Sequence, residues 1–145
     1  MHEAASKAIF DSQVGKLNER LLQLRGWVLH STEYPILDVS FHKEPRVPLR
    51  VRLICDNWDE QPPSIQFLSL DGNLLTVIKR DPAGIINESP HPSTGRPFVC
   101  APGSLEYHTH SSHIADLWSN YKNQSDFDLG GILTKLWSGW KKIPL

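Results

Sequence analysis

Four short strand-like stretches, packed closely between residues 27 and 70, place the strongest constraint on how this chain can fold. Apolar and polar residues alternate over residues 37–41 and 49–55, the period-two pattern of a half-buried strand. Residues 27–31 precede these stretches, and residues 64–70 follow them. The connections are too short to hold crossover helices, so we expect a four-stranded antiparallel meander.

The ends of these stretches add detail to the predicted sheet. Cys55 continues the apolar row of its strand, which indicates a buried structural thiol. His42 falls on the polar row, which indicates a solvated side chain. After a proline-containing loop at residues 56–63 and an Asp71-Gly72 turn, residues 74–78 could add a short fifth strand.

Helical periodicity flanks the strands on both sides. We expect an N-terminal helix that begins at Asp11 or Ser12, runs to about Arg25 and stops at Gly26. Two amphipathic helices close the chain, the first over residues 114–121 and the second capped by Asp128. The apolar faces of these helices are composed of Phe10, Val14, Leu17, Leu21 and Leu24, then Ile114, Leu117, Trp118 and Tyr121, then Leu129, Ile132, Leu133, Leu136, Trp137 and Trp140. The order of elements predicts an α+β domain with helices packed on the sheet.

Composition narrows the classes of function. The chain has 145 residues, which suits one domain with its own hydrophobic core. Its formal net charge of −1 provides no strong electrostatic field that would attract nucleic acid or an anionic membrane. No apolar run is long enough for a membrane-spanning helix, and the first residues lack the pattern of a signal peptide. Two widely separated cysteines do not make a disulfide framework. We therefore expect a single cytoplasmic domain over residues 1–145, with no nucleic-acid or membrane partner.

Residues 100–113 concentrate the groups that carry chemistry. This stretch contains one of the two cysteines, a carboxylate and three of the seven histidines, namely Cys100, Glu106, His108, His110 and His113. Thiolate, carboxylate and imidazole groups bind zinc or take part in nucleophilic catalysis. His91 lies upstream in a proline-rich segment, residues 81–102, which we expect to be an ordered, irregular loop that fixes the position of Cys100.

One hypothesis for this stretch is a metal site. Cys100, Glu106, His113 and either His108 or His110 supply four donors of the kinds that zinc accepts tetrahedrally. A water molecule in place of one of these donors would make the site catalytic. The spacing matches no common zinc motif, so the hypothesis rests on the types of donor.

A second hypothesis makes Cys100 a nucleophile, because a nearby imidazole or backbone dipole favours the thiolate. The histidines available as a base are His108, His110 and His113, and Glu106 could orient the chosen ring. Pro102 and Gly103 should leave backbone amides available near the sulfur. The remaining alternative is a hydrated polar loop without chemistry, in which His91 only bonds the loop backbone.

The order of the motifs resembles the ubiquitin-conjugating enzymes. Residues 61–69 read Gln-Pro-Pro-Ser-Ile-Gln-Phe-Leu-Ser, which is similar to the Pro-Pro dipeptide and strand of that family. His91-Pro92-Ser93 resembles the family's His-Pro-Asn motif, and Cys100 follows at about the distance of the family's catalytic cysteine. The amphipathic helices also fit, so the resemblance covers nearly the whole chain and implies the fold of this family.

Two features depart from that family. Ser93 stands where the family has an asparagine that supports the oxyanion during aminolysis, and a serine hydroxyl is shorter. The family usually has an acidic, leucine-rich stretch after the cysteine, whereas this chain has Glu106 and three histidines. That pattern is similar to a small bacterial family found beside ubiquitin-like genes and described as predicted metal-binding for its Cys-Glu-His-His signature. A divergent bacterial conjugating enzyme would combine both resemblances.

The resemblances imply a bacterial ubiquitin-conjugating-like enzyme, in a pathway associated with antiphage defence. Cys100 would accept a ubiquitin-like protein from an activating enzyme as a thioester and pass it to a protein target. His110 or His113 would deprotonate the acceptor or polarise the thioester, Glu106 would orient the imidazole, and His91 would hold the loop. No cofactor is expected, because the activating enzyme uses the ATP.

Two other functions on the same scaffold stay open. The first is a zinc-binding protein that uses Cys100, Glu106, His108 or His110, and His113 as ligands. The second is a catalytically inactive adaptor that only binds a ubiquitin-like protein, and this binding would survive the loss of Cys100.

Overall fold

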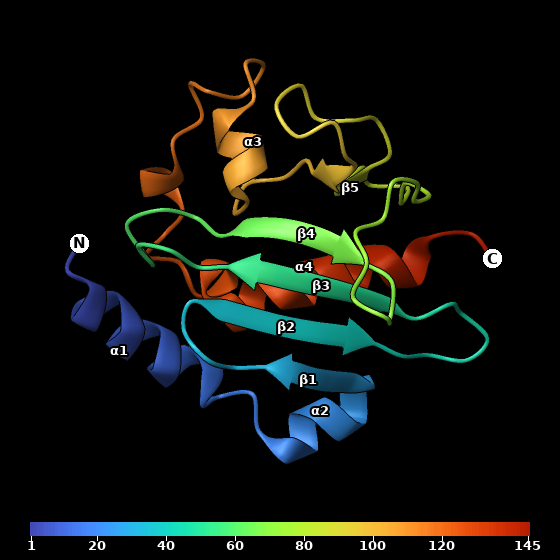
Figure 1. Cartoon of the computed structure of the whole chain (residues 1–145), viewed down its shortest axis with the longest axis horizontal. Helices are drawn as coiled ribbons and strands as arrows, with labels where there is room; N and C mark the ends of the chain where they lie inside the picture. Colours follow the sequence, from blue (N-terminus) through green and yellow to red (C-terminus); the bar gives the residue numbers. More distant parts are fainter.

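The four strand-like stretches form one antiparallel sheet in the computed structural model, which describes residues 1–145 (Figure 1). The strands are adjacent in chain order: β1 (Trp27–Ser31), β2 (Ile36–Phe41), β3 (Leu49–Ile54) and β4 (Ser64–Leu68). The predicted meander and the α+β class are therefore confirmed. The arrangement of helices and strands is compatible with a ubiquitin-conjugating-like fold.

Each strand turns one row of apolar side chains towards the same buried face. Val39 of β2 lies opposite Val51 of β3, and Val51 lies opposite Phe67 of β4. Val39 and Val51 are fully buried, and Phe67 is nearly so. Cys55 follows this row and is also fully buried, as predicted, and burial raises the pKa of its thiol.

The possible fifth strand over residues 74–78 does not form. Leu74 makes one isolated bridge to Leu68, and the Leu75 N–H donates to the carbonyl oxygen of Phe67 at 2.9 Å. β4 ends at Leu68, earlier than predicted. Val77 projects into solvent, so this segment lacks the buried row that would hold it to the sheet.

Helix α4 (Leu129–Lys142) covers the apolar face and lies behind the sheet in Figure 1. As predicted, Asp128 caps it by accepting the Gly131 N–H at 2.7 Å. Its apolar stripe enters the core, where Trp140 lies 5.8 Å from Phe41 between ring centroids. No helix in the chain has both the length and the apolar character that crossing a bilayer requires.

The single N-terminal helix predicted from about residue 11 to 25 is wrong. The chain forms α1 (Glu3–Val14) and α2 (Glu19–Arg25), and the Asn18 side chain between them accepts the Leu21 N–H at 3.0 Å. This break reorients the predicted apolar face. Leu17 is buried, whereas Leu24 is 77% exposed.

The helix predicted over residues 114–121 is also wrong. That segment contains turns and one short 3₁₀ helix, η1 (Trp118–Asn120), and a second one, η2 (Ser125–Phe127), precedes α4. Ile114 and Leu117 are 63% and 56% exposed, so half of the expected apolar face is mostly open to solvent. The segment over which the apolar residues recur, 114–121, is shorter than the length that a stable isolated helix needs.

The proline-rich segment 81–102 is mostly irregular, as predicted, but it contains a small two-stranded sheet. β5 (Ile86–Asn87) pairs with β6 (Phe98–Val99), and helix α3 (Leu105–Thr109) follows. These elements lie beside the β4 edge of the main sheet (Figure 1). The sheet edge therefore supports the segment that carries Cys100.

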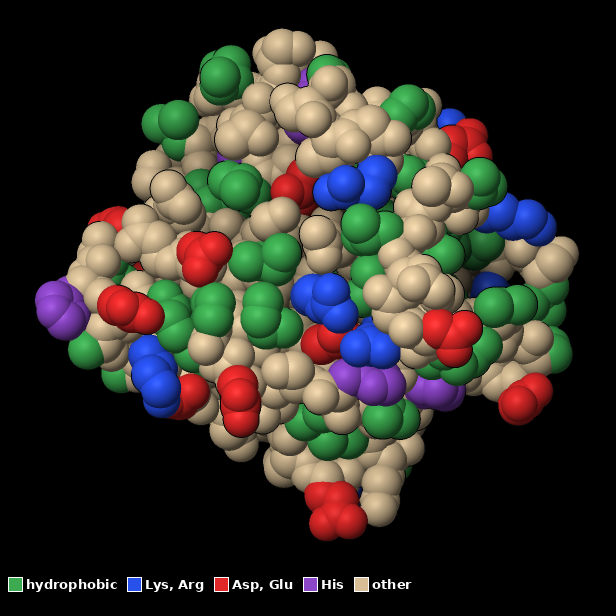
Figure 2. Space-filling view, in the orientation of Figure 1, with side chains coloured by type: hydrophobic (Ala, Val, Ile, Leu, Met, Phe, Trp, Pro, Cys, Tyr) green, Lys and Arg blue, Asp and Glu red, His purple; other side chains and the backbone are tan.

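The outer face of the sheet carries a polar network that is more buried than the alternation predicts. Asp38 is 2% exposed, and it accepts hydrogen bonds from Arg50 at 2.8 Å and Arg52 at 3.1 Å. Burial opposes ionisation of this carboxyl, but the bonds from both arginines lower its pKa. Figure 2 shows basic, acidic and histidine side chains gathered on this face.

Ser40 lies in the same polar row and is fully buried between two imidazoles. Its Oγ is 2.8 Å from Nε2 of His30 and 2.7 Å from Nε2 of His42. His42 is therefore half-buried and hydrogen-bonded rather than solvated, contrary to the prediction. Burial and the nearby Arg50 lower the pKa of His30.

Gly26 provides a test of the fold, because it ends α2 in the left-handed region (φ 70°) and a Cβ at this position would collide with the carbonyl oxygen of His42. We expect Gly26→Ala to lower the free energy of unfolding, measured by urea denaturation, by more than about 2 kcal/mol. Gly84 is a matched control, since its φ is 76° and a Cβ there meets nothing within 4 Å. Gly84→Ala should cost only about 1 kcal/mol, and equal losses would contradict the role of the close contact.

Candidate active site

Cys100 follows β6 directly, and backbone bonds fix its position. Its N–H donates to the carbonyl oxygen of Ile85 at 2.8 Å and so extends the β5–β6 pairing. Beyond it, Ser104 Oγ donates to the Val99 carbonyl at 2.7 Å and accepts the Tyr107 N–H, which caps α3. Cys100 is a free, partly exposed thiol, in contrast to the buried Cys55.

His113 is the histidine that contacts Cys100. The distance from Sγ of Cys100 to Nε2 of His113 is 3.7 Å, within the range of a hydrogen bond to sulfur. The His113 ring stacks on Tyr107, with ring centroids 4.3 Å apart and an interplanar angle of 16°. A thiol and an imidazole in this arrangement can exchange a proton, which is what activates a cysteine nucleophile.

Tyr107, Asp116 and Tyr121 form a clamp behind His113. The Tyr107 hydroxyl donates to Asp116 Oδ2 at 2.6 Å, and the Tyr121 hydroxyl donates to both carboxylate oxygens at 2.9 and 2.8 Å. The bond to Asp116 raises the pKa of Tyr107 to about 12, and the bonds from both tyrosines lower the pKa of Asp116. The Asp116 N–H also donates to the His113 carbonyl at 2.9 Å, so the clamp holds the turn that presents the imidazole.

Sequence reasoning did not identify this clamp. Tyr121 was placed on the face of a helix that does not form, and Tyr107 and Asp116 received no role. The spacing of the three residues follows no motif, because a turn rather than a helix brings them together. Tyrosines close to a histidine-rich stretch were the only available signal.

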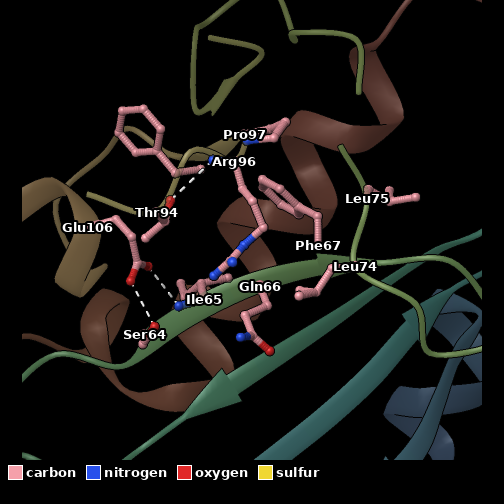
Figure 3. A pocket seen from close by; sticks show the side chains of 11 residues that line it. Ser64, Ile65, Gln66, Phe67, Leu74, Leu75, Thr94, Arg96, Pro97 and Glu106 are labelled. Atoms are coloured by element: carbon pink, nitrogen blue, oxygen red, sulfur yellow. Dashed lines mark hydrogen bonds between the residues drawn. The ribbon is translucent and has the colours of Figure 1, made fainter. Parts of the chain in front are cut away.

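Glu106 does not orient an imidazole, which differs from the role expected of it. Its side chain points towards β4, where Oε1 accepts the Ile65 N–H at 2.8 Å and Oε2 accepts the Ser64 hydroxyl at 2.7 Å (Figure 3). It is 7% exposed, and burial raises its pKa. Arg96 and Thr94 line the same narrow pocket from the loop above (Figure 3). Glu106 thus fastens α3 to the sheet edge.

His108 is also engaged with the backbone rather than with Cys100. Its Nδ1–H donates to the carbonyl oxygen of Asp116 at 2.7 Å, and its Nε2 accepts the Gly103 N–H at 3.1 Å. Burial lowers the pKa of His108, so the ring is held neutral in one tautomer. The Gly103 amide, which we expected to be available near the sulfur, is therefore already used.

Both ring nitrogens of His91 bond backbone groups. Its ring is 3% exposed, Nε2 donates to the Glu106 carbonyl at 3.0 Å, and Nδ1 accepts the Ser93 N–H at 3.0 Å. The ring of His110 stacks on that of Phe98, with ring centroids 5.8 Å apart. The centroid of the His110 ring is 5.7 Å from that of His113. Its Nδ1 accepts the Ser112 N–H at 3.1 Å. Ser93 itself is exposed.

The four candidate zinc ligands do not converge on one point. Glu106 faces β4, and both ring nitrogens of His108 are bonded to the backbone. The candidates left are Cys100, His113 in contact with it, and His110, whose Nδ1 accepts the Ser112 N–H. The structure contains no group of three or more histidine, cysteine, aspartate or glutamate side chains arranged to hold a metal ion. The arrangement present therefore does not fit a tetrahedral zinc site, and we derive no step through a metal.

Comparison with protein-family models and with curated proteins finds no match to this chain. What the site can do is therefore argued from its own geometry. That geometry is a partly exposed thiol, one imidazole in contact with it, and supporting residues that fix both.

The contact between Cys100 and His113 predicts a difference between the two candidate bases. His113→Gln should slow the alkylation of Cys100 by iodoacetamide at neutral pH several-fold, because Nε2 no longer takes the thiol proton. Mass spectrometry of the peptides measures the rate at Cys100. His110→Gln is the matched control and should react like the wild type. A slower reaction in the control alone would identify His110 as the base instead.

Burial of Glu106 predicts a dependence of stability on pH. Because its folded-state pKa is raised, its contribution to stability is present below its ordinary value of 4.5 and is lost as pH rises through the folded-state pKa. Glu106→Gln does not titrate. The stability of the wild type relative to this variant, measured by urea denaturation, should therefore fall as pH rises from 4.5 through the raised folded-state pKa. A constant difference would mean that Glu106 titrates normally.

Proposed function

We propose that this protein is a ubiquitin-conjugating-like enzyme that carries a ubiquitin-like protein as a thioester on Cys100 and transfers it to a protein target. The observation that carries the proposal is the partly exposed Cys100 thiol in contact with Nε2 of His113. Both lie on an α+β scaffold compatible with such an enzyme. The order of Pro62-Pro63, His91-Pro92 and Cys100 in the sequence supports the same assignment.

Loading would be a transfer between two thiols. The Cys100 thiol gives its proton to His113, and the thiolate attacks the carbonyl carbon of the thioester on the activating enzyme. A new C–S bond forms at Cys100, the old C–S bond breaks, and the leaving thiolate of the activating enzyme takes up the proton held by His113, which returns the imidazole to its neutral form. No cofactor belongs to this step, since the activating enzyme has already used ATP to form the first thioester.

Transfer to the target would use the same imidazole. An amine or hydroxyl of the target attacks the thioester carbonyl, loses its proton to neutral His113, and releases the Cys100 thiol. His91 and Glu106 act as positioning residues, because each bonds the loop or the sheet edge instead of the sulfur. His108 positions the turn through Gly103 and Asp116.

The test is reconstitution with the activating enzyme, ATP and the ubiquitin-like protein of the same pathway. Wild-type protein should gain the mass of the ubiquitin-like protein in a form that a thiol reductant removes. Cys100→Ser should form an adduct that resists the reductant and yields to hydroxide, because an oxyester replaces the thioester. Mass spectrometry and non-reducing electrophoresis follow the adducts.

Two controls make the result specific. Cys55→Ser should charge like the wild type, because the Cys55 thiol is fully buried. Cys100→Ala should form no adduct, and normal charging of this variant would contradict the assignment of the nucleophile. If Cys100→Ala binds the ubiquitin-like protein and the wild type never forms an adduct, the protein is the inactive adaptor.

A further inference from the structure

A second imidazole, that of His110, lies beside the pair formed by Cys100 and His113. Phe98 and Cys100 are two residues apart along the chain at β6, so their side chains share one face of the small β5–β6 sheet. The His110 ring stacks on Phe98 with an interplanar angle of 12°, and Nε2 of His113 contacts the sulfur of Cys100. The centroids of the two imidazoles are 5.7 Å apart. His110 therefore stands next to the reactive thiol without being its base.

The hydrogen bonds of His110 decide which ring nitrogen carries the hydrogen. Its Nδ1 accepts the backbone N–H of Ser112 at 3.1 Å. A ring nitrogen that accepts a hydrogen bond carries no hydrogen, so the hydrogen of the neutral ring is on Nε2. This Nε2–H has no partner within the protein, and the side chain is only half-buried. The site thus contains one free imidazole N–H that a ligand can use.

The two neighbouring rings present opposite hydrogen-bonding groups. Nε2 of His113 must be without hydrogen to take the proton of the Cys100 thiol, whereas Nε2 of His110 carries one. Acyl transfer needs both kinds of group, because a base removes the proton of the nucleophile and a donor stabilises the oxygen that becomes negative. An alkylation of the thiol needs only the base.

The backbone near the sulfur supplies few donors for such an oxygen. The N–H of Cys100 donates to the Ile85 carbonyl, the N–H of Gly103 donates to His108, and Pro102 has no N–H. Among residues 100–103 only the Ala101 amide is left without a partner. A side chain is therefore the source of any second donor.

We propose that His110 is a further catalytic residue, whose Nε2–H donates a hydrogen bond to the carbonyl oxygen of the acyl group that is transferred to or from Cys100. This role rests on the acyl transfer proposed above. When the thiolate attacks the carbonyl carbon, the new C–S bond forms and one electron pair of the C=O bond moves to oxygen, where the N–H stabilises it. When the intermediate collapses, the C=O bond re-forms and the bond to the leaving group breaks. His110 keeps its hydrogen throughout.

Two reactions of Cys100 in the purified full chain test this role. Acetylation by phenyl thioacetate passes through an oxyanion, alkylation by iodoacetamide does not, and mass spectrometry of the peptides measures both rates. His110→Phe keeps a ring on Phe98 but has no N–H, so it should slow acetylation roughly tenfold and leave alkylation unchanged. The loss of an oxyanion donor costs about 10²–10³ with a bound substrate, and a small probe is held less firmly.

Two further variants separate a donor from a base and from a structural role. His110→Gln keeps an N–H donor and should recover most of the acetylation rate that His110→Phe loses. His113→Gln should slow both reactions, because both need the thiolate. A purely structural role of His110 would disturb the contact between Cys100 and His113 and would slow both reactions alike.

The role of His110 is overturned if His110→Phe acetylates like the wild type, if it slows both reactions by the same factor, or if His110→Gln loses as much as His110→Phe. Asn87 lies opposite Phe98 in the β5–β6 sheet, so its amide is the competing side-chain donor. Slow acetylation in Asn87→Ala alone would assign the oxygen to Asn87 instead. None of these reactions uses a ubiquitin-like protein. Failure to charge in the reconstitution would reject the proposed function, whereas failure here would reject only the role of His110.

Discussion

Packing of α4 against the inner face of the meander is the interaction on which the rest of the structure depends. The core joins all four strands, α1 and α4, and it includes fully buried Phe10, Phe41 and Leu133. Because one face is buried, a shift of one residue in any strand would move its whole apolar row into solvent, so the register is fixed. The fixed edge at β4 then supports α3 through Glu106 and so positions Cys100.

Sequence patterns predicted the sheet well because each strand has one apolar row. They also predicted α4, from its capping residue Asp128 and from the apolar stripe of the helix. The patterns failed where the helical periodicity of the sequence continues across a point at which the helix is interrupted. The period from Phe10 to Leu24 continues through Asn18, whose side chain caps a new helix, so tertiary geometry and not periodicity decided the break. At residues 114–121 the turns and the bonds of Asp116 to tyrosines outweighed a short apolar repeat.

For the site, the sequence could identify the types of group but not their directions. It placed Cys100 and the histidines in one stretch, and the structure brings Cys100 and His113 into contact. Nothing in the spacing indicated that Glu106 would turn to β4, or that His108 would use both nitrogens on the backbone. These choices depend on which buried amides lack partners in the folded chain, and a sequence does not display that.

The hydroxyl of Ser40 has one hydrogen and two imidazole nitrogens within reach. When the hydroxyl hydrogen goes to one ring, the other ring must donate to Oγ, and the two neutral rings then hold different tautomers. A change in either ring then requires the hydroxyl to rotate and the other ring to move its own hydrogen. His30 and His42 are thus linked through one hydroxyl, so the tautomer of one ring constrains the tautomer of the other on the face of the sheet opposite α4.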